Sequence, residues 1–249
     1  MRFDSTVIFP RNQFVYKAGN ANEPVVAGND PGFGYGVLRW PQIDVLPARP
    51  NAAYADFNGA VRKRASKFVD GVDSGDKNAA FPAGVDASGT VDGFYVVKAA
   101  NDRFIDVTLF NMSYGWGAAH PNTNSNSFLW WFDHNRELTI EDVFLPHSGW
   151  QDKLTTLAVK NLRSQPGLQE MLGDDIDKTV KATLSDPTNW TLTRDGLTVT
   201  FGQYAIGPYA IGMPEAQISW SDLKLYLAPG LQPATLPAPA ISPSPWALN

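Results

Sequence analysis

Chemistry-bearing side chains gather in the segment YGWGAAHPNTNSN, which spans Tyr114 to Asn126. It combines small residues with one imidazole, that of His120, followed by the stiff Pro121 and a run of amide and hydroxyl groups. Glycine, proline and asparagine interrupt regular structure, so we expect a shaped loop lined with polar groups. The segment IGPYAIGM, from Ile206 to Met213, has the same character and is the second predicted loop.

His120 is the candidate general base, because histidine titrates close to neutral pH. Catalysis would also need a carboxylate or a nucleophile beside the ring. Asp106, Ser113 and Asp133 are available for that role, but no motif links them to His120. The alternative, which we favour, is that the imidazole hydrogen-bonds a backbone group and holds the loop before Pro121.

Metal chemistry has little support in the sequence. The three histidines, His120, His134 and His147, include no pair at the helical i, i+4 spacing that zinc sites use. The Asp-rich segment from Asp70 to Asp92 could offer carboxylates to calcium, but it lacks the EF-hand pattern. Cysteine is absent, which excludes disulfides and thiolate chemistry. We predict no metal and no cofactor, and leave a calcium site in the Asp-rich loop as the open alternative.

Aromatic residues beside the two predicted loops are candidates for binding, because tyrosine and tryptophan often anchor interfaces or stack on sugar rings. An aromatic content of 12% requires most rings to be buried, so Tyr114, Trp130 and Trp131 are assigned to the core. Trp116 and Tyr209 are the expected surface anchors. The complete predicted binding set is Trp116, Gly117, His120, Asn122, Tyr204 and Tyr209.

Composition narrows the class of partner. The 249 residues are 43% hydrophobic and carry a formal net charge of -5, which argues against nucleic acid and weakly favours a basic macromolecule. No stretch approaches the roughly 18 apolar residues that a membrane span needs, so no membrane span is expected. The N-terminal MRFDSTVIFP does not resemble a signal peptide. The protein is therefore either cytoplasmic or a mature form whose export signal has been removed.

Periodicity predicts an α+β fold. Apolar residues three or four apart predict one helix after Pro50 and another from Trp150 to Arg163, the second capped by Ser148. Thr139 and Asp142 predict a capping box for a short helical turn between them. Strands are expected at residues 6–16, 35–45, 94–99, 103–114, 128–132, 190–193, 197–204 and 217–219, several of them joined by tight turns.

These elements divide into two small helix-on-antiparallel-sheet units in tandem. The predicted organisation is an N-terminal extended arm at residues 1–36, one α+β unit at 37–134, a second at 135–228, and a proline-rich tail at 229–249. Proline-rich segments favour extended backbone, so the tail is interpreted as a linker or a solvent-exposed strap.

Two stretches resemble a known family. GAAHPNTNSNSF followed by RELTIEDVF, and later DGLTVTFGQYAIGPYAIGMPEAQISWSDLKLYL, resemble the RsiV-type domain of unknown function. That domain occurs in the extracytoplasmic parts of lysozyme-sensing anti-sigma factors and of PdaC-type peptidoglycan deacetylases. The resemblance covers roughly Trp40 to Leu227 and implies two small α+β halves. Nothing in the chain resembles a transmembrane helix, a sigma-binding segment or a deacetylase domain, so the resemblance implies an isolated extracytoplasmic module.

The expected function is therefore a non-catalytic extracytoplasmic binding module, periplasmic or secreted. Its ligand would be a cell-wall glycan, such as a peptidoglycan fragment, or a wall-acting protein such as lysozyme. The alternative is a hydrolase of cell-wall or small ester substrates that uses His120 as general base. A third hypothesis is a surface-attached scaffold held by the proline-rich tail.

Overall fold

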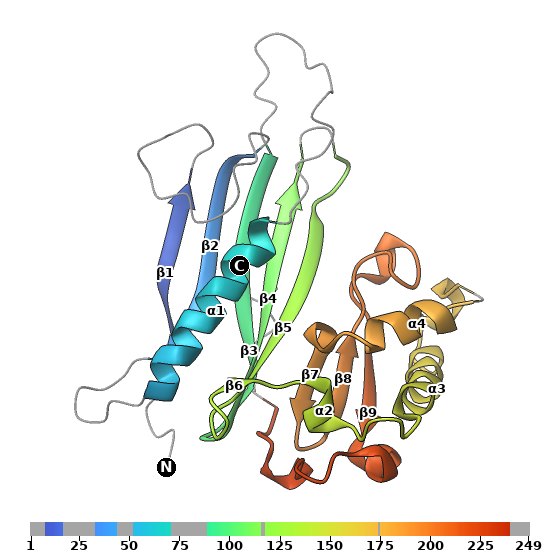
Figure 1. Cartoon of the computed structure of the whole chain (residues 1–249). Helices are drawn as coiled ribbons and strands as arrows, with labels where there is room; N and C mark the ends of the chain where they lie inside the picture. The colour runs from blue at the N-terminus through green and yellow to red at the C-terminus, as the bar shows by residue number, and fades with distance from the viewer. Residues whose placement is uncertain are drawn as a thin grey trace. The chain divides into compact units, whose positions relative to one another are not determined.

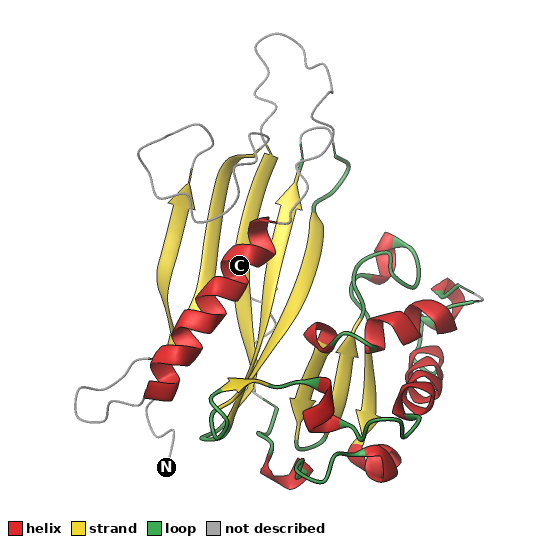
Figure 2. Ribbon diagram, viewed as in Figure 1, coloured by secondary structure: helices red, strands yellow, loops and turns green. Residues whose placement is uncertain are grey.

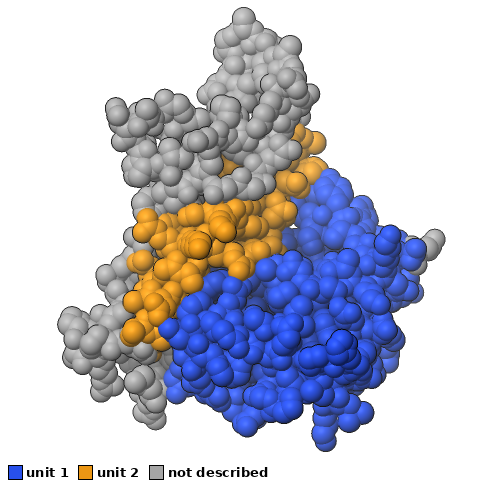
Figure 3. All heavy atoms as spheres, viewed as in Figure 1, with its two compact units in different colours: residues 1–3, 96–108, 127–249 blue, residues 4–95, 109–126 orange. Residues whose placement is uncertain are grey.

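The computed structural model describes residues 8–16, 33–43, 52–70, 89–115, 118–173 and 175–239 of the chain. Its contacts form two compact units (Figure 3). Unit 1 holds described residues 96–108, 127–173 and 175–239, and unit 2 holds the others. The tandem division predicted at residue 134 concerns separately folding domains, which a grouping of contacts does not test, and it stays a prediction.

A six-stranded sheet runs through the first half of the chain in the order β1-β2-β3-β4-β5-β6. β1 pairs antiparallel with β2, whereas β2 pairs parallel with β3. Parallel neighbours need a crossover connection, and the helix α1 supplies it, lying across one face of the sheet (Figure 1). The bounds are β1 Ile8–Tyr16, β2 Phe33–Ile43, α1 Ala52–Asp70, β3 Gly89–Ala100, β4 Phe104–Tyr114, β5 Asn122–Trp131 and β6 Arg136–Glu137.

Helix α1 packs through the predicted apolar stripe. Phe57, Val61 and Ala65 are buried at 0–1% exposure, because residues three and four apart share one helix face. The Asn58 side chain donates to the Ile43 carbonyl and accepts from the Ile43 N–H, at 2.9 and 2.8 Å. These contacts attach α1 to the end of β2.

Unit 1 contains the antiparallel sheet β7-β8-β9, with α3 packed against β9 and α4 (Figures 1 and 2). Its core combines apolar residues of all these elements, including Leu154, Leu184, Trp190, Val199 and Ile218. The helices are α2 Ile140–Val143, α3 Trp150–Arg163, α4 Asp177–Leu184 and α5 Trp220–Leu223, and the strands are β7 Trp190–Thr193, β8 Gly196–Thr200 and β9 Glu215–Ser219. Short 3₁₀ turns are η1 Gln169–Met171, η2 Pro187–Asn189, η3 Tyr209–Ile211, η4 Lys224–Tyr226 and η5 Pro233–Thr235.

The predicted α+β class, with helices on sheets, is confirmed, and the parallel β2–β3 pair is the exception in strand direction. The capping box at Thr139 is also confirmed, since both reciprocal contacts with Asp142 are present. The cap predicted at Ser148 is wrong. Gly149, at φ 80°, stands at the N-cap of α3, and the Ser148 hydroxyl donates to the Leu145 carbonyl at 2.8 Å.

Two loop boundaries predicted from the sequence are also wrong. The first loop ends at Pro121, because β5 begins at Asn122. Polar side chains on this strand have partners: Asn124 donates to the Asn111 side chain at 3.2 Å, and Arg64 donates to Asn126 at 3.0 Å. The second wrong boundary is the start of the loop after β8. This strand ends at Thr200, four residues before its predicted end.

The described part of the proline-rich tail, residues 229–239, is not a solvent-exposed strap. Leu231 and Leu236 are 6% and 4% exposed and belong to the core of unit 1. The Pro237 carbonyl accepts from the N–H of Arg194 at 2.9 Å, next to the end of β7. This segment therefore contributes to folding rather than serving as a linker.

Both outer strands of the β7-β8-β9 sheet are covered by the chain itself. On β9, the Gln217 N–H donates to the Asn161 side chain at 3.2 Å, and the Glu215 carbonyl accepts from the Gln165 side chain at 2.7 Å. On β7, the N–H of Leu192 donates to the Asp106 carboxylate at 3.0 Å. In the part of the chain that the structure describes, no helix has the length and apolar character to cross a membrane.

Candidate binding surface

The predicted site residues lie in both units. Trp116 and Gly117 fall outside the described residues. His120 is half-buried in unit 2, and Asn122 is exposed at the first position of β5. Tyr204 and Tyr209 belong to unit 1. The two groups are therefore described separately.

His120 makes the kind of contact that the structural role predicts. Its Nδ1 lies 3.1 Å from the carbonyl oxygen of Pro121. The two carboxylates proposed as catalytic partners are engaged elsewhere: Asp106 accepts from Leu192, and Asp133 accepts from Arg103 Nε at 2.6 Å. These contacts favour a loop-holding role for the imidazole.

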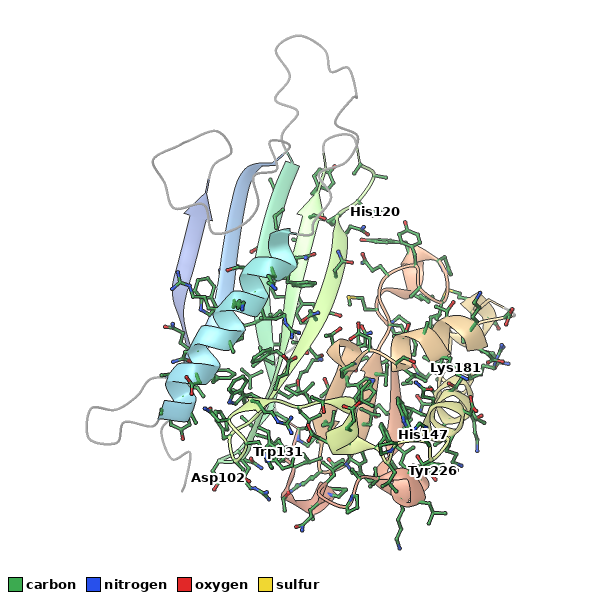
Figure 4. All side chains as sticks on the ribbon, in the orientation of Figure 1. Asp102, His120, Trp131, His147, Lys181 and Tyr226 are labelled. Carbon is green, nitrogen blue, oxygen red and sulfur yellow. The ribbon has the colours of Figure 1, made fainter. Side chains whose placement is uncertain are left out.

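The other two histidines also have local explanations. The His134 ring meets the edge of Trp131, with 4.0 Å between ring centroids. His147 has a left-handed backbone at φ 57° and lines a cavity of about 350 Å³ with Asp152 and Lys181 (labelled with His147 in Figure 4). Within the described ranges, no three histidine, aspartate or glutamate side chains gather in a way that could hold a metal ion.

The segment 202–213 between β8 and β9, which we call the tyrosine loop, is closed at its base. The N–H of Phe201 donates to the Pro214 carbonyl at 2.9 Å, and Phe201 is fully buried. Ile206 is 3% exposed and joins the hydrophobic core. Backbone hydrogen bonds from Ala205 to Gly202 and from Ile211 to Pro208, both 3.1 Å, stabilise its turns.

Gly207 lets the tyrosine loop lie directly against Met171, the last residue of η1. A Cβ atom at this position would come within 2.7 Å of the Met171 carbonyl oxygen, closer than real side chains approach backbone atoms. Glycine is therefore required at 207 for the observed packing. The Met171 backbone therefore packs against the loop at Gly207, and the buried Ile206 side chain anchors the loop in the core.

Tyr204 is the unusual residue of the loop. Its φ of 64° lies in the left-handed region, which bulky residues rarely adopt and which costs on the order of 1–3 kcal/mol. Its side chain is nevertheless 54% exposed. The Tyr204 and Tyr209 ring centroids are 5.6 Å apart at an interplanar angle of 41°, so the two form a tilted aromatic pair, the tyrosine pair. A strained backbone that displays an exposed ring is typical of a recognition site.

The sequence correctly assigns Trp130 and Trp131 to the interior, where each is 6% exposed. Of the two loop tyrosines, the sequence favours Tyr209 as the surface anchor, whereas Tyr204 is the exposed ring and Tyr209 is half-buried. Tyr114 was assigned to the core and is 43% exposed, with its hydroxyl donating to the Ala118 carbonyl at 2.9 Å. That assignment is corrected.

Asp106 is a chemically unusual residue that sequence reasoning considered only as a partner of His120. It is 2% exposed, and its Oδ1 has no hydrogen-bond partner among the described residues. Burial raises its pKa to about 8, although the Leu192 N–H, Lys98 and Thr191 offset part of the effect. The only sequence signal is a carboxylate within the apolar run of β4.

Comparison with known proteins agrees with the fold. Residues 141–221, which include the whole tyrosine loop, match a family described as "Protein of unknown function (DUF3298)". No curated protein matches the chain. The RsiV-type context given by the sequence resemblance stays a prediction, whereas a DUF3298 domain at these residues is shown.

Two crystal structures of DUF3298 family proteins resemble this chain. One, from Bacteroides fragilis NCTC 9343, is 16% identical, has a TM-score of 0.57, and matches over 87% of this chain and 91% of its own. The other, from Pseudomonas aeruginosa PAO1, is 17% identical, has a TM-score of 0.46, and matches over 79% of this chain and 86% of its own. At this identity, the first similarity shows a common fold and nothing about a ligand.

Proposed function

We propose that the protein is a non-catalytic, extracytoplasmic binding module whose tyrosine pair engages a basic wall-acting protein of the lysozyme class. The observation that carries the proposal is the backbone of Tyr204, strained at φ 64° while its ring is 54% exposed. Its ring lies beside that of Tyr209 and stays open to solvent, so it is accessible to a partner.

The chemistry around the loop fits a protein partner. Tyrosine and methionine are enriched in protein interfaces, and Met171, whose backbone lies against Gly207, is 39% exposed. A loop held in place by buried Ile206 loses little conformational freedom on binding, which favours affinity.

Charge favours a basic partner. The chain carries a formal net charge of -5, and Glu170 and Asp175 on either side of the Met171 segment are exposed. Opposite charge on the partner would raise the association rate at low salt. The extracytoplasmic location and lysozyme itself come from the sequence resemblance and are part of the proposal.

The hydrolase hypothesis has no observation in its favour, since Asp106 and Asp133 contact Leu192 and Arg103. A peptidoglycan glycan remains the other ligand considered, and it is an outcome of the test below.

The test measures binding of lysozyme to the purified protein by biolayer interferometry, with wild type and Tyr204→Asn. Asparagine tolerates the left-handed region, so this variant removes the ring without adding strain. We expect the melting temperature to be kept or raised and lysozyme affinity to fall at least tenfold. Leu225→Ala is the matched control, because Leu225 is 82% exposed on η4, and it should bind like wild type.

Absence of lysozyme binding by the wild type would overturn the proposal. So would unchanged affinity in Tyr204→Asn. Binding of soluble peptidoglycan fragments, lost in the same variant, would replace the protein partner by a glycan and leave the tyrosine pair as the site.

A further inference from the structure

A polar cavity lies over one face of the β7-β8-β9 sheet, the face opposite to the core of unit 1. Its volume is about 500 Å³, within the range of small-molecule sites. Successive side chains of a strand point to opposite faces, so Leu192 and Val199 enter the core while Thr191, Thr193 and Thr198 line the cavity. Neither Tyr204 nor Tyr209 is among the lining residues.

Strand register places three of these polar side chains in one row. Thr191 lies opposite Thr198, and Thr198 lies opposite Gln217. Neighbouring strands are about 4.8 Å apart, so the Thr198 hydroxyl and the Gln217 amide lie side by side on the cavity floor. They are next to Thr191, whose side chain bonds the Asp106 carboxylate. Among the described residues, no hydrogen bond engages the Thr198 hydroxyl or the Gln217 side-chain amide. Both groups are therefore available to a ligand.

A carboxylate two residues along β9 from Gln217, that of Glu215 opposite Thr200, is already oriented. Glu215 Oε1 accepts from Lys98 Nζ and from the Thr200 hydroxyl, both at 3.4 Å. Both described bonds end on Oε1, so Oε2 is left as an acceptor for ligand donors. Because Lys98 offsets the charge of Glu215, the centre of the cavity is close to neutral.

We propose that this cavity binds a neutral polyhydroxylated ligand, a saccharide of one or two rings. Hydroxyl groups both donate and accept hydrogen bonds, which matches a floor of threonine hydroxyls, a glutamine amide and a carboxylate oxygen. A cation would find Lys98 beside its carboxylate partner, and an anion would meet Glu215 and Asp195. No aromatic residue lines the cavity, so affinity in the millimolar range is expected. The site is independent of the tyrosine pair.

The test is a titration of ¹⁵N-labelled protein with glucose, N-acetylglucosamine and their β-1,4-linked disaccharides, followed by NMR. We expect saturable shifts of the Thr198 and Gln217 amide signals. Thr198→Val keeps the shape of the side chain and removes its hydroxyl, and Gln217→Ala removes the amide. Each should weaken binding at least fivefold. Gln169→Ala, exposed on η1, is the control and should bind like wild type.

Shifts that are absent, or confined to residues outside the cavity, would overturn the proposal. Tighter binding of a diamine of similar size than of any saccharide would also overturn it, because the site would then recognise charge. Tyr204→Asn should leave saccharide binding unchanged, so failure of this proposal and failure of the lysozyme proposal can be told apart.

Discussion

The Asp106 carboxylate accepts a 3.0 Å hydrogen bond from the backbone N–H of Leu192, 86 residues further along the chain. Leu192 lies on β7, an outer strand of its sheet, so a side chain satisfies a backbone group that would otherwise lack a strand partner. This contact requires the Asp106 carboxylate to be buried, and burial raises its pKa because the charged form loses its hydration.

Asp106→Asn is predicted to change how stability depends on pH. The folded-state pKa is about 8, above the ordinary value of 3.8, so between these values the folded state holds a proton that the unfolded state has released. The contribution of Asp106 to the free energy of unfolding should therefore be fully present below pH 4 and be lost as the pH rises to 8. The asparagine oxygen can still accept from Leu192 without titrating.

Chemical denaturation at pH 5, 6, 7 and 8 measures this effect. The free energy of unfolding of the wild type should fall across the series, and that of Asp106→Asn should change less. Asp222→Asn, at an exposed residue of α5, is the control and should keep the wild-type slope. Equal slopes in Asp106→Asn and wild type would contradict the prediction.

Gly207→Ala is predicted to displace the tyrosine loop. The new methyl group would lie 2.7 Å from the Met171 carbonyl oxygen, and overpacking of this kind costs roughly 1–3 kcal/mol. The melting temperature should fall, with weaker lysozyme binding as the loop shifts. Gly202→Ala is the matched control within the same loop, since its Cβ would meet no atom within 4 Å. Equal stability of the two variants would show that the close approach is unimportant.

His120→Ala is predicted to destabilise the loop before β5 without removing an activity. The imidazole Nδ1 contacts the Pro121 carbonyl, and loss of a hydrogen bond costs about 0.5–1.5 kcal/mol. The melting temperature should fall slightly relative to Asn122→Ala, an exposed neighbour. Ester or glycan hydrolysis by the wild type that disappears in His120→Ala at an unchanged melting temperature would establish the hydrolase hypothesis instead.

Asp142→Ala is predicted to destabilise the α2 turn by about 1 kcal/mol, the usual cost of losing a helix cap. Arg136 donates to both carboxylate oxygens, at 2.6 and 2.7 Å, and together with the Thr139 contacts lowers the Asp142 pKa to about 2. A lowered pKa contributes stability above pH 4 that is lost as the pH falls towards 2. Urea denaturation of both proteins at pH 7 and pH 2.5 should show a clearly smaller difference at pH 2.5, because the unfolded carboxyl is protonated there and the folded one is close to its pKa. An equal difference at both pH values would exclude the charged form as the cause.

Leu236→Ala is predicted to destabilise the protein by about 2–5 kcal/mol, as expected for a leucine that fills a core. Leu236 is 4% exposed, whereas Leu225, at 82%, serves as the control for the same substitution. Thermal denaturation should show a large loss for the first variant and almost none for the second. Similar values for both would mean that the segment after residue 229 does not contribute to the core.

Local patterns were sufficient to predict several elements. The stripe of Phe57, Val61 and Ala65 identifies α1, because helical spacing alone places these residues on one face. The Thr139 and Asp142 pair identifies α2 through chemistry that acts over three residues. The tight turn expected between the strands at 190–193 and 197–204 is also present, since Thr193 pairs with Gly196 and leaves Arg194 and Asp195 as the two-residue turn.

The features that were missed depend on residues distant in sequence. Asn124 and Asn126 lie on β5, where Asn124 donates to Asn111 and Asn126 accepts from Arg64. A polar run has no apolar alternation that would predict a strand there. Leu236 belongs to the core of unit 1, and its neighbour Pro237 accepts a hydrogen bond from Arg194, 43 residues earlier. The parallel pairing of β2 with β3 depends on α1 crossing the sheet between them, and no local residue spacing predicts that crossing.

The candidate site was predicted in part. Tyr204 and Tyr209 were named from the composition of their loop, and the structure brings their rings together. The need for glycine at 207 was not predictable, since it depends on where Met171 of η1 lies. The left-handed backbone of Tyr204 has no signal in the loop composition. Whether these residues bind a partner stays a prediction.

The covered edges of the β7-β8-β9 sheet limit how this unit can associate. Asn161 and Gln165 occupy positions along β9 where a foreign strand would otherwise pair, and Asp106 does the same on β7. Ordered fibres grow by adding strands to open edges, so the folded sheet offers poor templates for polymerisation. Strand addition to this sheet is therefore not expected, and recognition at this sheet must use side chains rather than main-chain pairing.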